Sequence, residues 1–451
     1  MATLRVLLVL AAFFDLEIDQ MDVITAFQNP YLTEEVYMKI PKGCTIPGLP
    51  SGSIVQLIKA LYGLKQSAHE WYKDIDGFLR SIGFLRSRYD ADLYLRRDCI
   101  LLLVVDDTIV IGHRRPVDEV KKLIAAKYRM KDLGPVQTFI GWQITRDRPN
   151  RTLKIHQTRY IRQILKRFGM ESCKPVKTPM VPNTRLVKND STASLEATRD
   201  YQALVGKVMY AMTSTRPDIA FTVSQLSQHT SNPSPEHELA GKHLLRYLQG
   251  TADVGITFRG TDMDLTGYTD ASYGEDVETR RSTSGYIFTV CGGAVSWKSK
   301  KQNIVALSSM ESEYIAMTEA TKEAIWLASI HEDISQTLQN KWELVEKRSQ
   351  LKWELTDPYN RPDDNDDPSS IRTPTLWTDS QSAIDLAENP KHHDRSKHIA
   401  IRHHFVRDAV ANGHIKLEYL PSSDMTADAL TKALPKDLHN KHARSMGLLG
   451  I

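Results

Sequence analysis

The chain has 451 residues, of which 41% are hydrophobic and 25% are charged, an ordinary globular composition that excludes an intrinsically disordered chain. Two or three domains are expected at this length. The formal net charge of +3 and the pI of about 8.4 are only mildly basic, so any nucleic-acid site has to come from local patches.

The first fourteen residues place Arg5 ahead of a short apolar run. A signal peptide is one interpretation, and a secreted or membrane-anchored protein would rest on residues 4–14 alone. We expect instead a buried helix packed under the next strand, because the run leads directly into a strand pattern around Asp22. No segment reaches the roughly 20 apolar residues of a membrane span.

Hydrophobic periodicity in the first 260 residues predicts a mixture of strands and helices, followed by a helical segment. Residues 171–200 are rich in Pro, Ser, Thr and Asn, and are expected to be a linker. The expected elements are two strands flanking a turn within 100–111, a helix over 117–130, strands over 139–144 and 153–156, and helices over 201–213, 217–230 and 235–250.

The pattern changes from residue 264 onward, where three strands precede a long helix. Residues 335–373 are polar with an acidic tract and are expected to be a solvated insertion. The expected elements are strands over 265–272, 285–290 and 294–300, a helix over 309–332, a strand over 375–379, a helix over 380–388, a strand over 415–420 and a helix over 425–434.

Four acidic residues of the C-terminal half stand in or beside these elements. Asp270 lies within the first strand, Glu311 in the first turn of the long helix, Asp379 at a strand end and Asp428 in the last helix. A carboxylate in an apolar strand costs several kcal/mol unless it is paired or binds a metal ion. Hydrolysis of a phosphodiester by two Mg²⁺ ions about 4 Å apart needs such a carboxylate cluster, and oxygen ligands suit Mg²⁺ or Mn²⁺ and not zinc.

Three acidic residues of the N-terminal half also lie within hydrophobic, strand-like sequence. Asp22 lies in QMDVITAF, and Asp106 and Asp107 lie in VVDDTIV, between hydrophobic segments. Nucleotidyl transfer uses two metal ions, held by aspartates, to align the primer oxygen with the triphosphate.

The C-terminal half is very similar to the ribonuclease H domain of Copia-type retrotransposons. The similarity rests on TRRSTSGYIFTVCGGAVSWKSKKQNIVALSSMESEYIA, DSQSAIDLAENPKHHDRSKHIAIRHHF and ADALTKALP. It implies a ribonuclease H-like mixed five-stranded sheet with helices, and it implies that Asp270, Glu311, Asp379 and Asp428 hold two Mg²⁺ or Mn²⁺ ions. The implied substrate is an RNA–DNA hybrid.

The N-terminal half resembles the reverse transcriptase of the same family. QMDVITAF, EEVYMKIPKG, LYGLKQSAHEWY and VVDD resemble its palm motifs, while TSTRPDIAF and LLRYLQGT match its connecting region. The resemblance implies that Asp22, Asp106 and Asp107 are catalytic metal ligands acting on an RNA template, a DNA primer and deoxynucleoside triphosphates. Val104 departs from the family, which usually has an aromatic residue there, and Pro30 replaces a glycine.

The resemblance implies an α/β and α+β chain. The expected organisation is a reverse-transcriptase palm with partial fingers over 1–170, a linker over 171–200, thumb or connection helices over 201–258 and a ribonuclease H-like domain over 264–450. The sequence starts just ahead of Asp22, so the basic fingers that grip the triphosphate are expected to be missing and polymerase activity to be weak. The alternative is a non-catalytic nucleic-acid-binding remnant of a transposon.

Several basic residues are candidate substrate contacts of the nuclease half. The alternative for each is an ordinary basic surface. The candidates are Arg280, Arg281, Lys298, Lys300 and Lys301. His398 or His393, both in the family's HxRSKH motif, is a further candidate for proton transfer or substrate contact. The neighbouring His392, His393, His403 and His404 lack the Cys or acid pattern of a zinc site.

The four cysteines, Cys44, Cys99, Cys173 and Cys291, are far apart and form no CxxC pair. They predict reduced thiols and no disulfide framework. The expected location is therefore the cytoplasm or the nucleus.

Overall fold

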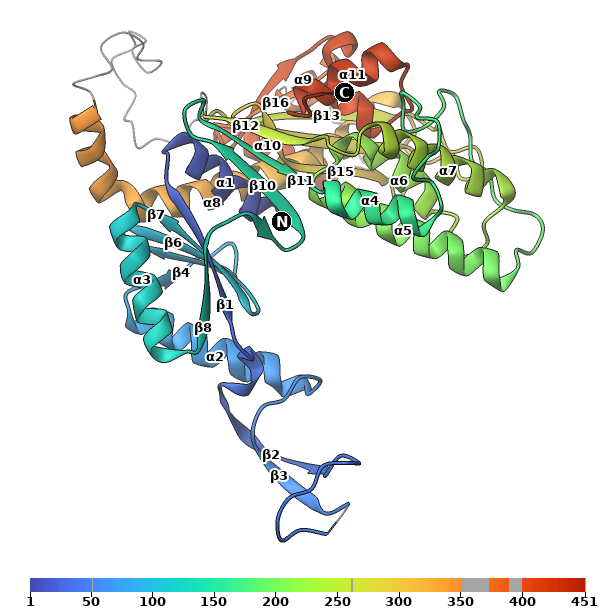
Figure 1. The fold of residues 1–451 in the computed structure, drawn as a ribbon. Coiled ribbons are helices and arrows are strands. Elements are labelled where there is room, and N and C mark those ends of the chain that lie inside the picture. Colours follow the sequence, from blue (N-terminus) through green and yellow to red (C-terminus); the bar gives the residue numbers. More distant parts are fainter. Residues whose placement is uncertain (51, 261–262, 350–372, 389–399, 451) are drawn as a thin grey trace. The chain divides into compact units, whose positions relative to one another are not determined.

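The computed structural model describes residues 1–50, 52–260, 263–349, 373–388 and 400–450 (Figure 1). By contacts the chain divides into two compact units. The first combines Met1–Asp15, Gln137–Glu332 and the described residues from 373 onward; the second is built on Leu16–Val136. Within the described ranges, no helix is both long enough and apolar enough to cross a membrane.

The second unit is a six-stranded antiparallel sheet, in the order β4-β5-β6-β7-β1-β8, with two helices packed on it. The strands expected around the Asp106–Asp107 turn are confirmed as β6 and β7. Its elements are β1 (Glu17–Val23), β4 (Leu85–Arg86), β5 (Leu93–Arg96), β6 (Cys99–Val104), β7 (Asp107–Gly112), β8 (Met130–Pro135), α2 (Lys65–Ser81) and α3 (Arg114–Lys127).

The apolar spacing of helix α2 explains why it covers this sheet. Trp71, Ile75 and Leu79 recur every four residues and are all buried, so they form one helix face. They join alternate residues of β6, such as Leu101 and Leu103, in one core. Between β1 and α2 the chain forms a short helix η1 (Ala26–Gln28) and a two-stranded ribbon of β2 (Tyr31–Lys39) and β3 (Ile54–Lys59).

The first unit contains the five-stranded sheet expected from the sequence, in the order β15-β14-β13-β16-β17. The first three strands pair antiparallel, whereas β16 pairs parallel with both β13 and β17. This mixed topology confirms the predicted ribonuclease H-like architecture. The strands are β13 (Thr266–Ser272), β14 (Thr283–Val290), β15 (Gly293–Lys301), β16 (Thr375–Thr378) and β17 (Lys416–Tyr419).

The helices of this part are α8 (Ser309–Ser349), α9 (Gln381–Glu388), α10 (Ala400–Ala411) and α11 (Lys436–Ser445). The helix expected over 425–434 is wrong, because only a short 3-10 helix η7 (Thr426–Leu430) forms there. Pro435 disfavours helical backbone at the residue before it, which limits the helix from that side. Most of the expected 335–373 insertion lies outside the described residues.

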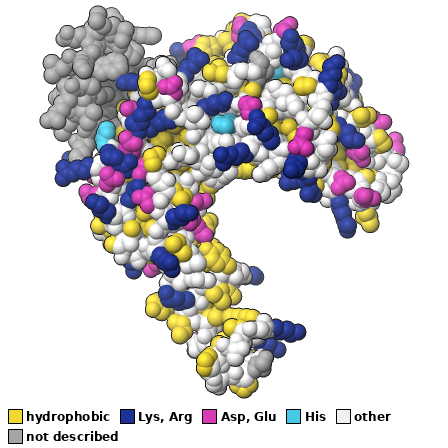
Figure 2. Space-filling view, viewed as in Figure 1, with side chains coloured by type: hydrophobic (Ala, Val, Ile, Leu, Met, Phe, Trp, Pro, Cys, Tyr) yellow, Lys and Arg dark blue, Asp and Glu magenta, His cyan; other side chains and the backbone are white. Residues whose placement is uncertain are grey.

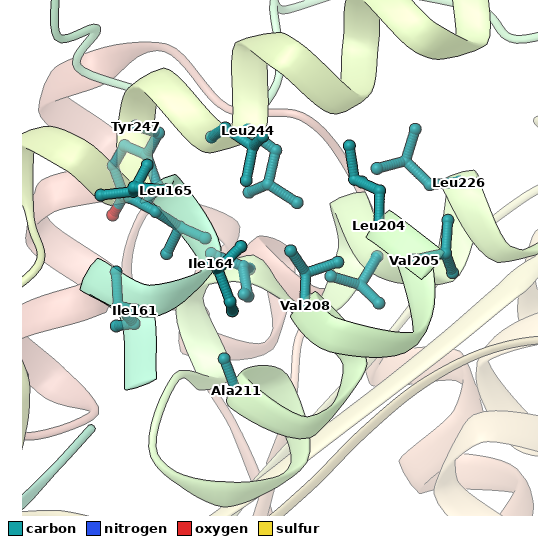
Figure 3. Close-up of a cluster of buried hydrophobic side chains, with 14 of the residues drawn as sticks. Ile161, Ile164, Leu165, Leu204, Val205, Val208, Ala211, Leu226, Leu244 and Tyr247 are labelled. Carbon is teal, nitrogen blue, oxygen red and sulfur yellow. The ribbon is translucent and has the colours of Figure 1, made fainter. Parts of the chain in front are cut away.

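Four helices pack on one another around a buried apolar cluster in the same unit (Figure 3). They are α4 (Thr158–Arg167), α5 (Leu195–Ser214), α6 (Ala220–Ser227) and α7 (Pro235–Gly250), with η2 (Pro217–Ile219) before α6. Helix α5 begins within the expected linker, because the Ser194 side chain accepts a hydrogen bond from the Ala197 amide at 3.1 Å and caps it.

A second sheet of this unit joins segments that the sequence interpretation placed in different domains. Its order is β12-β11-β10-β9, and β11 pairs antiparallel with β12. The contact division therefore groups residues from 137 onward with the five-stranded sheet, whereas the sequence grouped 1–170 together. The strands are β9 (Thr138–Phe139), β10 (Trp142–Asp147), β11 (Thr152–His156) and β12 (Gly255–Arg259).

The expected N-terminal helix is confirmed as α1 (Ala2–Phe13), but its packing differs from the prediction. It lies against β11, β12 and β15 and buries residues 3–12. Its Arg5 is 4% exposed and donates to the carbonyl oxygens of Val295 at 2.7 Å, Thr213 at 3.1 Å and Ser214 at 2.8 Å. The guanidinium also lies 4.0 Å from the ring centre of Trp297.

Replacing Arg5 by Met should destabilise this unit by about 2–4 kcal/mol, because two buried carbonyl oxygens and one partly buried one lose their donor. Denaturant unfolding measures the change. The matched control is Arg162→Met, since Arg162 forms a 3.0 Å ion pair with Asp253 while both side chains are exposed; its effect should stay within about 0.5 kcal/mol. Equal effects of the two substitutions would contradict a structural role for Arg5.

Candidate active sites

Three carboxylates from three different elements meet at one end of the five-stranded sheet. Asp270 lies in β13, Glu313 in the first turns of α8, and Asp379 directly after β16. Ligand oxygens of all three lie within 4.8 Å of one another. The parallel pairing of β13 with β16 explains this meeting, because it brings the carboxyl ends of both strands to the same edge.

Glu311, predicted as a ligand, has another role in the structure. Its Oε2 accepts a hydrogen bond from the Leu307 amide at 2.6 Å, and its own amide donates to the Ser308 hydroxyl at 3.1 Å. The Ser308 side chain thus caps the N-terminus of α8, while the Glu311 side chain binds the backbone just ahead of it. Glu313 follows two residues later, and residues two apart do not share a helix face, so Glu313 takes the position that the sequence interpretation gave to Glu311.

Asp428 stands beside this group, as predicted, but on the short helix η7. Its Oδ1 lies 2.9 Å from the Lys432 ammonium, which is also 4.0 Å from Asp270 Oδ2. The Thr431 hydroxyl donates a short hydrogen bond to Asp270. The sequence interpretation did not include Thr431 and Lys432 in the site. Their position three and four residues after Asp428 is a signal that could have identified them.

Burial and mutual repulsion make these carboxylates hard to ionise. Asp270, Glu313 and Asp428 are 3%, 8% and 3% exposed. Burial is the main cause that raises the pKa of Asp270 and, together with Asp270 and Asp379, holds the pKa of Glu313 well above its usual range. Burial and Asp270 raise the pKa of Asp428 to about 7. The site therefore attracts positive charge.

The residues fit divalent metal ions. The Oε2 atom of Glu313 is buried and has no hydrogen-bond partner among the described residues, although a buried carboxylate oxygen without a partner is costly. All donors are oxygen atoms, the ligand set that Mg²⁺ and Mn²⁺ prefer. Asp270, Glu313 and Asp379 would hold the ions, with Asp428 beside them.

The three predicted aspartates of the second unit also come together. Asp22 pairs directly with Asp107 between β1 and β7, and the Val23 amide donates to the Asp106 carbonyl at 2.9 Å. Burial is the largest cause that raises the pKa of Asp107, and Asp22 and Asp106 raise it further.

The turn that carries Asp106 has a constrained backbone. Val105 adopts a φ of 56°, which a β-branched residue rarely accepts. Its carbonyl accepts a hydrogen bond from the Trp71 indole at 3.0 Å, and the Tyr62 hydroxyl donates to Asp106 Oδ2 at 2.9 Å. Tyr62 and Trp71 belong to the LYGLKQSAHEWY motif, but their contacts with this turn were not foreseen.

The candidate basic contacts occupy differing surroundings. Lys298 forms an ion pair with Glu319 at 3.3 Å, and Lys301 pairs with Asp276. Arg280 and Lys300 are exposed and Arg281 is half-buried. His398, His392 and His393 lie outside the described residues. Figure 2 shows Lys and Arg side chains interspersed with Asp and Glu over the viewed face, in keeping with the near-neutral net charge.

Two features together define a class of protein: an antiparallel sheet with a triad of aspartates and a ribonuclease H-like sheet with a carboxylate site. It is the class that the sequence resemblance predicts, retrotransposon proteins with a reverse-transcriptase palm and a ribonuclease H-like domain. The family model described as reverse transcriptase (RNA-dependent DNA polymerase) matches residues 1–182.

Relatives cover the whole chain. It is 39% identical over its full length to the Pol polyprotein of transposon TNT 1-94 from Nicotiana tabacum and 32% identical to that of transposon RE1 from Arabidopsis thaliana, of which it covers 32% and 28%. It is 32% identical, over 67% of this chain, to all of a putative transposon Ty5-1 protein of Saccharomyces cerevisiae. The chain belongs to the reverse transcriptases of Copia-type retrotransposon Pol polyproteins.

The chain spans about a third of the length of the two plant polyproteins. Among solved structures, the N-terminal RNase H domain of a Mycobacterium tuberculosis protein, fused to maltose-binding protein, matches 41% of this chain and 98% of its own at 12% identity, with a TM-score of 0.23.

Substituting Glu313 by Gln should remove the thermal stabilisation that Mg²⁺ or Mn²⁺ gives, because the carboxylate that completes the triad is lost. Glu311→Gln is the matched control, two residues away on the same helix. It should keep the metal response and lose about 0.5–1 kcal/mol of stability through its weakened cap. The ligand assignment is wrong if only Glu311→Gln abolishes the metal response.

The metal-free chain should lose stability from this site as the pH rises. The folded-state pKa of Asp428 is raised from 3.8 to about 7, so the folded chain holds a proton that the unfolded chain has already released. This stability is complete below about pH 4 and disappears as the pH rises through about 7. Thermal unfolding at several pH values should show a flatter profile for Asp428→Asn, while Asp385→Asn, which removes an exposed carboxylate, should keep the wild-type profile.

Proposed function

We propose that the first unit cleaves the RNA strand of RNA–DNA hybrids by metal-dependent hydrolysis. The observation that carries the proposal is the convergence of Asp270, Glu313 and Asp379 within 4.8 Å, with one buried Glu313 oxygen lacking a partner among the described residues. Mg²⁺ or Mn²⁺ ions held by these three carboxylates would supply the charge that activates a water molecule and stabilises the attacking and leaving oxygens.

The protein residues hold the site in a fixed shape for this reaction. Asp270 is fixed by the hydrogen bond from Thr431 and by the β13–β14 pairing. Asp379 accepts a hydrogen bond from the Ser422 hydroxyl at 2.6 Å. Glu313 is placed by the capped first turn of α8. Such support keeps the carboxylate oxygens in position before substrate arrives.

Substrate recognition in this proposal uses charge and ribose chemistry. Exposed Arg280 and Lys300 are proposed to contact phosphates, with Arg281 beside them, while contacts to ribose 2′-hydroxyls select the RNA strand. Lys298 and Lys301 pair with Glu319 and Asp276 and would have to exchange these partners for phosphate.

The second unit is proposed to carry out RNA-directed DNA synthesis from deoxynucleoside triphosphates. Asp22 and Asp107 stand opposite each other, and Asp106 Oδ1 is buried without a hydrogen-bond partner among the described residues. These aspartates would hold the ions that align primer and triphosphate. Val104 offers less packing surface than the aromatic residue usual at that position, and activity is therefore expected to be modest.

Two activities in one chain allow a reciprocal test with the purified 451-residue protein and Mg²⁺. Asp270→Asn should lower hybrid cleavage at least ~100-fold and leave primer extension on an RNA template unchanged. Asp106→Asn should do the reverse, so each variant controls the other.

Cleavage that persists in Asp270→Asn would refute the nuclease proposal. If the wild-type chain binds the hybrid in a gel-shift assay but neither cleaves it nor extends a primer, the chain is a non-catalytic nucleic-acid-binding remnant.

A further inference from the structure

Lys432 places a positive charge inside the carboxylate site. Its ammonium is 2.9 Å from Asp428 Oδ1 and 4.0 Å from Asp270 Oδ2. Burial disfavours this charge, but Asp270, Asp428 and Asp379 outweigh burial and raise the pKa of Lys432. The ammonium therefore pairs with Asp428 and Asp270 and is also attracted by the charge of Asp379.

The carboxylates need such a partner when no metal ion is bound. Asp270, Glu313 and Asp428 are each more than nine-tenths buried, and like charges in a poorly solvated site repel strongly. Burial raises the pKa of all three, and Lys432 opposes this rise in each case. Thr431 adds a hydrogen bond to Asp270 but no charge.

The Lys432 side chain is also partly exposed to solvent. It remains 40% exposed while it pairs with the almost completely buried side chains of Asp428 and Asp270. A lysine side chain is long and flexible, and its ammonium is a compact, strongly hydrated charge. It can turn into solvent without any movement of the backbone.

We propose that Lys432 is the resident counter-ion of the metal-free site and that divalent ions displace it when they bind. This inference rests on the metal site of the proposed function. Lys432 makes metal binding an exchange of one cation for another. The lysine stabilises the fold without metal and weakens the apparent affinity for metal, because both cations use the same carboxylate oxygens.

The test compares wild-type chain, Lys432→Met and Lys432→Arg by thermal unfolding, first in chelator and then across a Mg²⁺ and a Mn²⁺ titration. Lys432→Met should unfold at lower temperature without metal and respond to metal at roughly three- to tenfold lower concentration, since a competing charge is gone. Lys432→Arg keeps the charge and should restore the wild-type metal midpoint. Lys416→Met, which removes an exposed lysine 2.6 Å from Glu418, should change neither value.

Each other outcome has a defined meaning. If Lys432→Met fails to fold in chelator and Mg²⁺ restores its fold, the proposal stands; if Mg²⁺ does not restore it, the lysine has a structural role and the proposal fails. An unchanged or higher metal midpoint in Lys432→Met also overturns it. None of these readouts requires cleavage, so an inactive chain with a shifted metal midpoint would refute the proposed function and leave the role of Lys432 intact.

Discussion

Buried carboxylates at the edge of the five-stranded sheet repel one another, and the contacts around them in this unit compensate for that repulsion. Asp270 of β13, Glu313 of α8 and Asp379 just after β16 meet in one small volume, with Asp428 of η7 beside them. Asp270, Glu313 and Asp428 are nearly inaccessible to water. Such an arrangement persists only where the surrounding fold over-determines it. Strand pairing, the cap of α8 and the hydrogen bonds from Thr431 and Ser422 all act to that end.

Much of this arrangement could be read from the sequence, because it depends on local pattern. Alternation of apolar residues located the strands, and the order of strands and helices indicated the mixed sheet. The positions of Asp270 and Asp379 relative to those strands followed directly. The aspartates of the N-terminal half could also be predicted from the sequence, because Asp22 and the Asp106–Asp107 turn interrupt strongly hydrophobic segments.

The sequence predictions were wrong in two situations. In one, the same residue fitted two local roles; in the other, the structure depends on contacts between residues that are distant in sequence. Ser308 and Glu311 match a capping box, a pattern that assigns Glu311 to the backbone of the helix start and leaves Glu313 for the site. No local pattern, by contrast, could show that Arg5 bonds to the carbonyl of Val295 or that β11 pairs with β12, because the partners are distant in sequence.

The position of helix α1 has a consequence for how the chain acquires its structure. Helix α1 is synthesised well before its partner strands, because β12 and β15 begin at Gly255 and Gly293. At synthesis rates of about 5–20 residues per second, this apolar helix is made on the order of ten seconds or more before the strands that cover it. The palm sequence can fold during that interval, while closing a loop of this length slows completion of the first unit. The apolar surface of α1 therefore stays uncovered in the nascent chain until β12 and β15 have been made.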